Sequence, residues 1–254
     1  MKEIEYNAGK AYEHSNSDEL EYIGKCLLIN NGKKKILAVG DLHLGYEGAL
    51  NESGVYIGRE MFKEMISYFD KLFAKIGKVD EIVLLGDVKH VFGNITNQEW
   101  SEMLGLFDYF DKYCEKIVIV KGNHDKILEP VVKKRKDIES RGFYVSGKFA
   151  FVHGDRDFEK INDEKVRYWV MGHGHPAVKI REGAKIEKYK CFLVGEYKGK
   201  EIIIVPSFLE ANIGTEPREN NLYMAWNFNL EKFDVKIVSE DFEVLDFGKL
   251  KKLK

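Results

Sequence analysis

Five short apolar runs in this chain stop at a glycine or a turn, and a potential metal-binding group follows each of them. The runs are KKILAVG before Asp41, EIVLLG before Asp87, KIVIVKG before Asn123, KFAFV before His153 and VRYWVMG before His173. Short apolar runs bounded in this way are typical of buried strands. In layered α/β folds, ligands gather in the loops beyond the carboxyl ends of the strands. The sequence therefore predicts a sheet with a site along one edge.

Amphipathic segments lie between these strands. Apolar residues recur at helical spacing over residues 59–76, 98–113 and 127–140, which predicts three helices. The Asn-Gly pair in NNG (30–32) predicts a hairpin, and Lys198–Gly199 marks a second one. Further strands are expected at MAWNFN and VKIVS near the end of the chain. Strands that alternate with helices, followed by a run of strands, predict an α/β layered fold with two sheets packed face to face.

The length of 254 residues and the absence of repeats or Pro/Ser-rich linkers favour one domain over 1–254, with a β-rich part at 180–245. No apolar run approaches the roughly 18–20 residues that cross a bilayer. The charged start MKEIEYNAGK has no apolar segment typical of a secretion signal. We therefore expect a cytoplasmic protein with no membrane partner.

Charge and cysteine content exclude two further classes. The formal net charge is −2, so no global basic field is present of the kind that a general nucleic-acid coat protein needs. The three cysteines stand far apart without CxxC spacing. This pattern argues against a disulfide framework and against a thiolate metal site.

Histidines concentrate at the strand ends. Only His14 lies elsewhere. The other six of the seven follow the predicted strands: His43, His90, His124, His153, His173 and His175. A lone histidine is more often a surface or hydrogen-bonded residue than a ligand. Many polar groups crowded at one sheet edge without a cation would, however, carry a heavy desolvation cost. The repetition therefore predicts a metal site.

The candidate ligands indicate the kind of metal. They comprise carboxylates, an amide oxygen and imidazoles, with no thiolate. This mixture suits Mn²⁺, Fe, Co, Ni or Zn²⁺ better than Ca²⁺, and it exceeds what one four-coordinate ion takes. We expect two divalent transition-metal ions, Mn²⁺ first among them, with Asp87 able to bridge the pair. Gly174 leaves His173 and His175 free to reach different ions.

The motifs D-x-H, G-D, G-N-H-D, H-G and G-H-x-H, in this order over 41–175, resemble the signature of the calcineurin-like metallophosphoesterases. The strings AVGDLHLGYE, LGDVKH, NQEW and GHGHPAV look most like the archaeal and bacterial ICC-like branch, which includes phosphoesterases associated with DNA ligase. The resemblance implies a four-layer α/β/β/α sandwich of two mixed sheets flanked by helices, with a dinuclear site at the sheet edge.

The resemblance also implies a role for each residue. One metal would be held by Asp41, His43 and His175, the other by Asn123, His153 and His173, and Asp87 would bridge them. His124 would protonate the leaving oxygen or orient the phosphate as general acid, and Asp125 would set its tautomer. The family often has Thr where this chain has Gly174, which removes a hydroxyl contact but no ligand.

Three features outside the ligand set are candidates for substrate binding. His90, three residues after Asp87, lines the substrate pocket or serves the structure. Arg156 clamps a phosphate or forms a solvated ion pair. The basic run KKRK (133–136), on a predicted helix, contacts a nucleic-acid backbone or forms a solvated face.

We expect a metal-dependent phosphoesterase that cleaves phosphodiester bonds of nucleotides or nucleic acids by in-line attack of a metal-bridging hydroxide. A phosphomonoesterase is an alternative. A DNA nuclease is another, although the chain is too short for the capping domain of the repair exonucleases of this family. A non-catalytic scaffold is disfavoured because every ligand position is filled. The expected partner is a phosphate-ester substrate, and a homodimer remains open.

Overall fold

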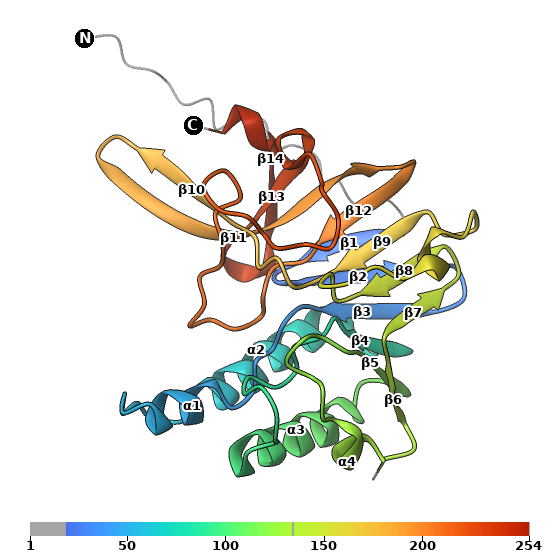
Figure 1. The fold of residues 1–254 in the computed structure, drawn as a ribbon, viewed down its shortest axis with the longest axis vertical. Coiled ribbons are helices and arrows are strands. Elements are labelled where there is room, and N and C mark those ends of the chain that lie inside the picture. The colour runs from blue at the N-terminus through green and yellow to red at the C-terminus, as the bar shows by residue number, and fades with distance from the viewer. Residues whose placement is uncertain (1–18, 134, 254) are drawn as a thin grey trace.

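The computed structural model describes residues 19–133 and 135–253. Its strands form two sheets, which lie one above the other (Figure 1). The first sheet consists, in spatial order, of β1 (Leu20–Ile23), β2 (Cys26–Asn30), β3 (Lys35–Val39), β4 (Glu81–Leu84), β5 (Lys116–Val120) and β6 (Ile138–Arg141). The second sheet consists of β14 (Val244–Lys249), β13 (Asp234–Val238), β11 (Lys185–Tyr197), β12 (Lys200–Ile204), β9 (Tyr168–Met171), β8 (Phe149–Val152) and β7 (Phe143–Ser146), with β10 (Ala177–Glu182) paired to β11.

Each sheet mixes antiparallel hairpins with parallel strands. Strands β3, β4, β5 and β6 run parallel, as do β8, β9 and β12 in the second sheet. Parallel neighbours present their carboxyl ends at the same edge. The residues that follow β3, β4 and β5 therefore meet those that follow β8 and β9 at one side of the sandwich.

Both predicted hairpins are confirmed. Strands β2 and β3 pair through Asn30 and Lys35, and the side chain of Asn31 accepts hydrogen bonds from the backbone of the turn. Strands β11 and β12 close at Tyr197 and Lys200. The two residues between them, Lys198 and Gly199, both have positive φ, as a two-residue turn with the right-handed strand twist requires.

The helices α1 (Tyr46–Glu52), α2 (Met61–Ile76), α3 (Asn97–Phe110) and α4 (Glu129–Val132) cover the outer face of the first sheet (Figure 1). The helices predicted at 59–76 and 98–113 are confirmed as α2 and α3. Helix α3 begins with a capping box, in which Thr96 and Glu99 satisfy each other's backbone N–H groups. The fully buried rings of Phe69, Phe107 and Phe110 join these helices to the sheet.

The helix predicted at 127–140 is wrong, because among the described residues of this segment only the four of α4 are helical. The chain then enters β6, where Ile138 pairs with Ile117 and is 5% exposed, so burial against the sheet outweighs the helical spacing. In the basic run, Arg135 pairs with Asp108, Asp111 and Asp137; Lys134 lies outside the described residues.

The strand predicted at MAWNFN is also wrong, since residues 224–229 form a loop. Its Trp226 packs on Trp169, with ring centroids 5.2 Å apart, so the apolar residues cover the second sheet without joining it. The strand predicted at VKIVS is confirmed as β13. Strands β1, β7, β10 and β14 were not predicted, and β6 lies at the end of the segment predicted as a helix.

Apolar side chains of both sheets form the central layer, with Val83 and Val118 of the first sheet and Phe151, Val170 and Ile203 of the second. The predicted α/β sandwich of two mixed sheets with helices is confirmed. Over the outer face of the second sheet, the described chain places loops and the short 3₁₀ helices η2 (Leu230–Lys232) and η4 (Leu250–Lys252).

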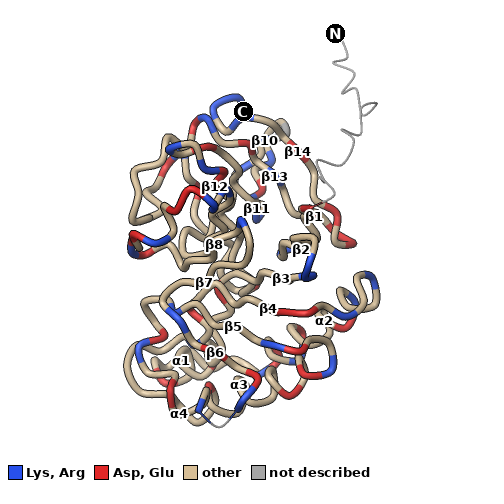
Figure 2. Tube along the Cα trace, turned by 90° about the vertical axis from the view of Figure 1, so that its right-hand side faces the viewer, with Lys and Arg blue, Asp and Glu red and all other residues tan. Residues whose placement is uncertain are grey.

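Basic and acidic residues are interspersed over both halves of the molecule (Figure 2). Within residues 19–133 and 135–253, no helix combines the length and apolar character needed to cross a membrane.

Candidate metal centre

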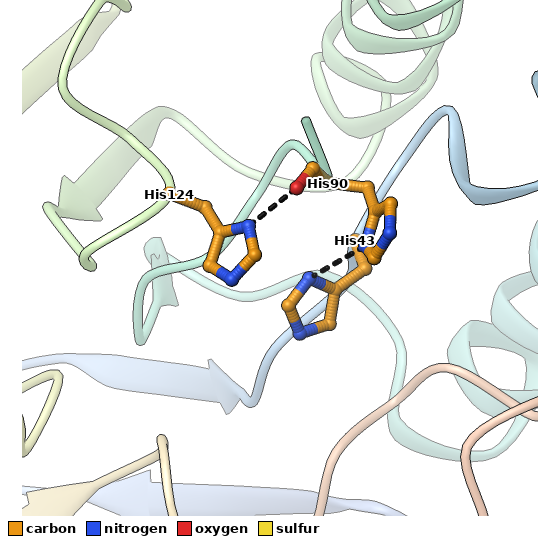
Figure 3. Close-up of side chains that lie close together, drawn as sticks. All are labelled: His43, His90 and His124. Carbon is orange, nitrogen blue, oxygen red and sulfur yellow. Dashed lines mark hydrogen bonds between the residues drawn. The ribbon is translucent and has the colours of Figure 1, made fainter. Parts of the chain in front are cut away.

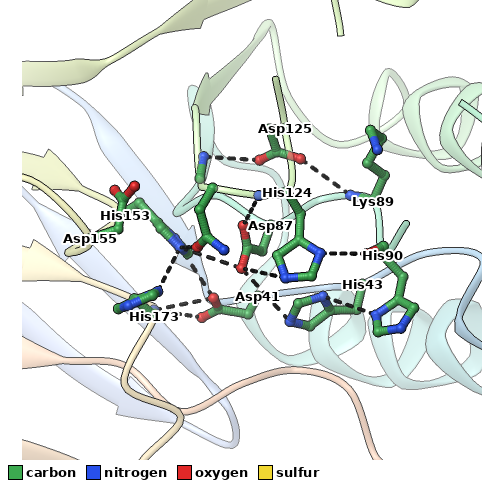
Figure 4. Close-up of polar contacts among 12 residues, drawn as sticks. Asp41, His43, Asp87, Lys89, His90, His124, Asp125, His153, Asp155 and His173 are labelled. Atoms are coloured by element: carbon green, nitrogen blue, oxygen red, sulfur yellow. Dashed lines mark hydrogen bonds and ion pairs between the residues drawn. The ribbon is translucent and has the colours of Figure 1, made fainter. Parts of the chain in front are cut away.

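Side chains from five strand ends converge at the shared edge of the two sheets (Figure 4). Their donor atoms form three groups within the described residues, each with all atoms inside 4.8 Å, and His43 belongs to two of them: Asp41–His43–His175, Asp87–His153–His173 and His43–His90–His124. Asn123 joins the second group, because its Oδ1 lies 3.1 Å from Nε2 of His153. The structure thus brings together all seven residues that the sequence nominated as ligands.

The first group contains a buried nitrogen with no hydrogen-bond partner. Nε2 of His175 is buried and unsatisfied, although it lies 3.1 Å from Oδ1 of Asp41. Asp41 is itself fully buried, and His43 is 5% exposed. Unpaired buried polar atoms are uncommon in folded proteins and call for a partner. A cation between these side chains would supply it.

In the second group, each imidazole uses one nitrogen to hold its ring in place. Nδ1 of His153 donates to the carbonyl of Leu85 at 2.8 Å, and Nε2 of His173 donates to the carbonyl of Tyr223 at 3.2 Å. The remaining nitrogens, Nε2 of His153 and Nδ1 of His173, lie 3.0 Å apart. Metal-binding histidines commonly have this arrangement, in which a carbonyl fixes the tautomer and leaves the other nitrogen for the ion.

Asp87 lies between the groups. Its Oδ2 is 3.4 Å from Nε2 of His153, 3.8 Å from Nε2 of His124 and 4.0 Å from Nε2 of His43. One carboxylate oxygen therefore faces imidazoles that follow three different strands.

Four of the candidate ligands have a strained backbone. The φ angles of His43, Asp87, His173 and His175 are 48°, 49°, 63° and 43°. This left-handed conformation costs non-glycine residues roughly 1–2 kcal/mol each. Such residues cluster at functional sites, where the surrounding structure enforces a geometry that the chain does not prefer.

Gly86, which precedes Asp87, lets two strand ends approach closely. Its φ is +97°, and a Cβ atom at this position would lie 2.4 Å from Nδ1 of His153. A side chain is therefore excluded sterically where the two sheets meet. The glycine at the end of EIVLLG is a requirement of the site as well as of the turn.

The protonation states suit cation binding. Burial, together with the nearby His175, lowers the pKa of His43 to about 3, so its imidazole is neutral. Burial alone would raise the pKa of Asp41, but the opposing effect of His175 and the neighbouring imidazoles is larger. The pKa is therefore lowered, and the carboxylate stays charged. Asp87 behaves in the same way, because the hydrogen bond from His153 lowers its pKa against the effect of burial.

His153 carries the compensating charge. Burial disfavours its charged form, but Asp87 and Asp41 outweigh burial and raise its pKa to about 9. Two buried carboxylates thus hold a proton on a buried imidazole. Carboxylates, an amide oxygen and imidazoles are ligands that divalent transition metals accept, and His153 would release its second proton to bind an ion. The residues present therefore fit divalent ions.

His124 belongs to the third group, together with His43 and His90 (Figure 3). Its Nδ1 donates to the carbonyl of His90, which leaves Nε2 facing Asp87. The expectation that Asp125 sets this tautomer is corrected, because its fully buried carboxylate accepts hydrogen bonds from the backbone N–H groups of Val88, Lys89 and Gly122 instead. Asp125 fixes the backbone beside Asp87 rather than the imidazole.

The two candidate substrate residues differ in position. Nδ1 of His90 lies 3.5 Å from Nδ1 of His43, and its ring meets Tyr46 edge-on, so His90 belongs to the centre (Figure 3). Arg156 is exposed, and its guanidinium pairs with Asp155 at 3.1 Å. Among the described residues no hydrogen bond or ion pair joins Arg156 to the candidate ligands.

Contacts from the loop after β12 were missed in the sequence. Ser207 Oγ donates to the carbonyl of Asp41 at 3.1 Å, and the side-chain amide of Asn212 lies 3.0 Å from Nδ1 of His175. The run EIIIV before this loop is a sixth apolar strand that ends in polar residues, which is the signal that could have revealed it.

Comparison with known proteins agrees with this geometry. The sequence model of the calcineurin-like phosphoesterase family matches residues 34–239. Among curated proteins, none matches the chain. The solved structure of Pseudomonas putida nuclease MPE is similar, with a TM-score of 0.57 and 18% identity over 90% of this chain and 98% of that one.

Two other solved structures are more distant. Wild-type Vps29 of Entamoeba histolytica in complex with zinc has a TM-score of 0.39 and 13% identity over 84% and 99% of the two chains. The phosphoesterase Yfce of E. coli has a TM-score of 0.36 and 14% identity over 82% and 95%. The family match extends over most of the chain, and the structure brings the side chains of all five motifs together. The chain therefore belongs to the calcineurin-like phosphoesterase family, whose members use divalent metal ions to hydrolyse phosphate esters.

Proposed function

We propose that this protein hydrolyses phosphodiester bonds of nucleotides or nucleic acids with the help of two divalent metal ions. The observation that supports a pair of ions is the position of Asp87, whose Oδ2 faces His43 of one donor group and His153 of the other. A carboxylate shared by two groups of ligands is typical of binuclear hydrolases.

The two donor groups support a role for each ligand. Asp41, His43 and His175 would hold one ion, Asn123, His153 and His173 would hold the other, and Asp87 would be shared. The absence of thiolates and the mixture of oxygen and nitrogen donors favour Mn²⁺, with Fe, Co, Ni and Zn as alternatives. When bound, such ions supply an activated water nucleophile and neutralise the charge of the phosphate.

His124 supplies the proton for the leaving group. Because its Nδ1–H is held by the carbonyl of His90, the second proton of the imidazolium is carried by Nε2, which faces Asp87. A general acid in this position protonates the leaving oxygen as the P–O bond breaks. His90, beside His43 and Tyr46, lines the substrate side of the centre.

A phosphomonoesterase and a DNA nuclease remain the alternative functions. The length of the chain no longer argues against a nuclease. The match to the Pseudomonas putida nuclease covers 98% of that protein's chain, so a nuclease of this fold can have a chain of similar length. Membership of the ICC-like branch stays a prediction. The homodimer stays one possible oligomeric state.

A substrate screen tests the proposal. The Mn²⁺-loaded protein is assayed on bis-p-nitrophenyl phosphate, p-nitrophenyl phosphate, cyclic nucleotides and linear DNA, with Asp87→Ala as the inactive control. We expect the diester to be cleaved with a higher kcat/KM than the monoester. A preference for the monoester would favour the phosphomonoesterase, digestion of DNA the nuclease, and no turnover of any substrate the scaffold.

A further inference from the structure

Phe92 is a large aromatic residue that is 61% exposed beside the proposed acid His124. It lies in the loop between β4 and α3. Its ring centroid is 3.7 Å from that of His124, with 30° between the ring planes, so the two rings are in face contact. The imidazole covers part of the phenyl ring and the rest is open to water. A single exposed aromatic is ordinary, but the backbone around this one is not.

Two buried charged residues hold the backbone of Val91, the residue directly before Phe92. The N–H of Val91 donates to Oε1 of Glu99 at 2.7 Å, and the carbonyl of Val91 accepts from Nζ of Lys89. Lys89 and Glu99 are both 0% exposed. Buried charges are costly unless their partners satisfy them. The fold therefore accepts a desolvation cost on both sides of one loop residue, and the backbone of that residue sets the direction of Phe92.

The loop is also anchored after Phe92. Oε2 of Glu99 accepts the N–H of Thr96 at 2.7 Å, so the carboxylate that holds Val91 also caps α3. Gly93 has a φ of +88°, which turns the chain away and leaves the phenyl ring exposed. Phe92 is thus fixed relative to His124 from both directions, instead of lying on a free loop.

We infer that Phe92 is a stacking surface for the nucleobase of the substrate's leaving group. The inference rests on the proposed function, which places the leaving oxygen at Nε2 of His124. Since Phe92 contacts that same imidazole, a leaving nucleoside lies within reach of the open face of the phenyl ring. Nucleobases stack on aromatic side chains with little dependence on base identity. The subsite selects esters whose leaving group is a nucleoside over esters whose leaving group is a bare sugar.

Covering His124 is the simpler role for Phe92, and it makes a different prediction. A residue that only holds the imidazole affects all substrates to the same extent, because each leaving oxygen needs the same proton. A stacking surface affects only substrates that carry a base. The comparison therefore needs two ligands that share the phosphate and the sugar and differ in the base alone.

Binding of non-hydrolysable phosphonates tests the inference separately from catalysis. Calorimetry with the Mn²⁺-loaded protein compares the 5′-methylenephosphonate analogue of adenosine monophosphate with that of ribose 5-phosphate. We expect the adenosine compound to bind on the order of 10-fold more tightly. Phe92→Ala should remove this preference and Phe92→Trp should keep it. Phe247→Ala, which removes an exposed phenyl ring from β14, is the matched control and should change nothing.

Each result separates the two hypotheses. A base preference that Phe92→Ala abolishes, in a protein that hydrolyses no ester, would leave the subsite standing and refute the proposed function. Equal affinity of the wild-type protein for both phosphonates overturns the subsite. An equal loss of affinity for both compounds in Phe92→Ala also overturns the subsite, since that loss would mean that Phe92 acts through His124 alone.

Discussion

Asp87 and His153 belong to different sheets, and Oδ2 of the first lies 3.4 Å from Nε2 of the second. Asp87 follows β4, whereas His153 follows β8, so the contact forms only when the two sheets are packed together. An ion held by both residues would therefore couple metal binding to the packing of the sandwich, because it would stabilise the folded arrangement.

Asp87→Ala should abolish both activity and binding of the metal pair. The substitution removes the carboxylate that faces His43 and His153 together, so neither donor group keeps its shared ligand. Metal content measured by mass spectrometry should fall below two ions per chain. Asp157→Ala, at an exposed position of the loop after β8, is the control. Substantial turnover in Asp87→Ala would refute the shared ligand.

His124→Ala should leave the metal content intact and lower turnover by roughly 10²–10⁴-fold, the usual contribution of a general acid. The side chain is not a member of the two groups proposed to bind the ions, and its Nε2 lies 3.8 Å from Oδ2 of Asp87. The loss should shrink for p-nitrophenyl esters, whose acidic leaving group needs little protonation. An equal loss for alkyl and p-nitrophenyl esters would remove the acid role.

The site was more predictable from the sequence than the fold around it. Its seven candidate ligands each follow a buried parallel strand, and parallel strands must present their carboxyl ends at one edge. The helix at 127–140 failed for the opposite reason, because helical spacing is a local signal and β6 is fixed by distant pairing with β5. Strands β10 and β14 likewise depend on partners that no local pattern reveals.

Other features of the site leave no sequence signal at all. The left-handed backbone of His43 and His175 is imposed by the surrounding structure. The hydrogen bond of His124 goes to a backbone carbonyl, which every residue possesses, so the sequence pointed to the neighbouring carboxylate of Asp125 instead. The placement of Phe92 depends on the buried pair Lys89 and Glu99, ten positions apart in sequence.

Gly86→Ala should weaken metal binding more than its backbone strain explains. At a φ of +97°, alanine costs roughly 1–2 kcal/mol of stability. Its Cβ would also lie 2.4 Å from Nδ1 of His153 and would displace that imidazole. Gly54→Ala is the matched control, since Gly54 has a φ of +92° and nothing within 4 Å of the added atom. Both variants should lose a similar free energy of unfolding through backbone strain, but only Gly86→Ala should lose metal affinity. Equal metal affinity in the two would show that His153 tolerates the displacement.

Metal affinity should rise with pH between about 7 and 9. In the metal-free protein, burial opposes charge on His153, but Asp87 and Asp41 raise its pKa to about 9, above the usual 6.5. That proton stabilises the metal-free fold fully below about pH 6.5, and the contribution is lost as the pH rises through about 9. An ion must displace the proton from Nε2, so its affinity should increase by about tenfold per pH unit and level off above about 9. Calorimetry in buffers of different ionisation enthalpy measures the released proton directly. A metal affinity that is flat over this range would mean that His153 is already neutral or does not bind the ion.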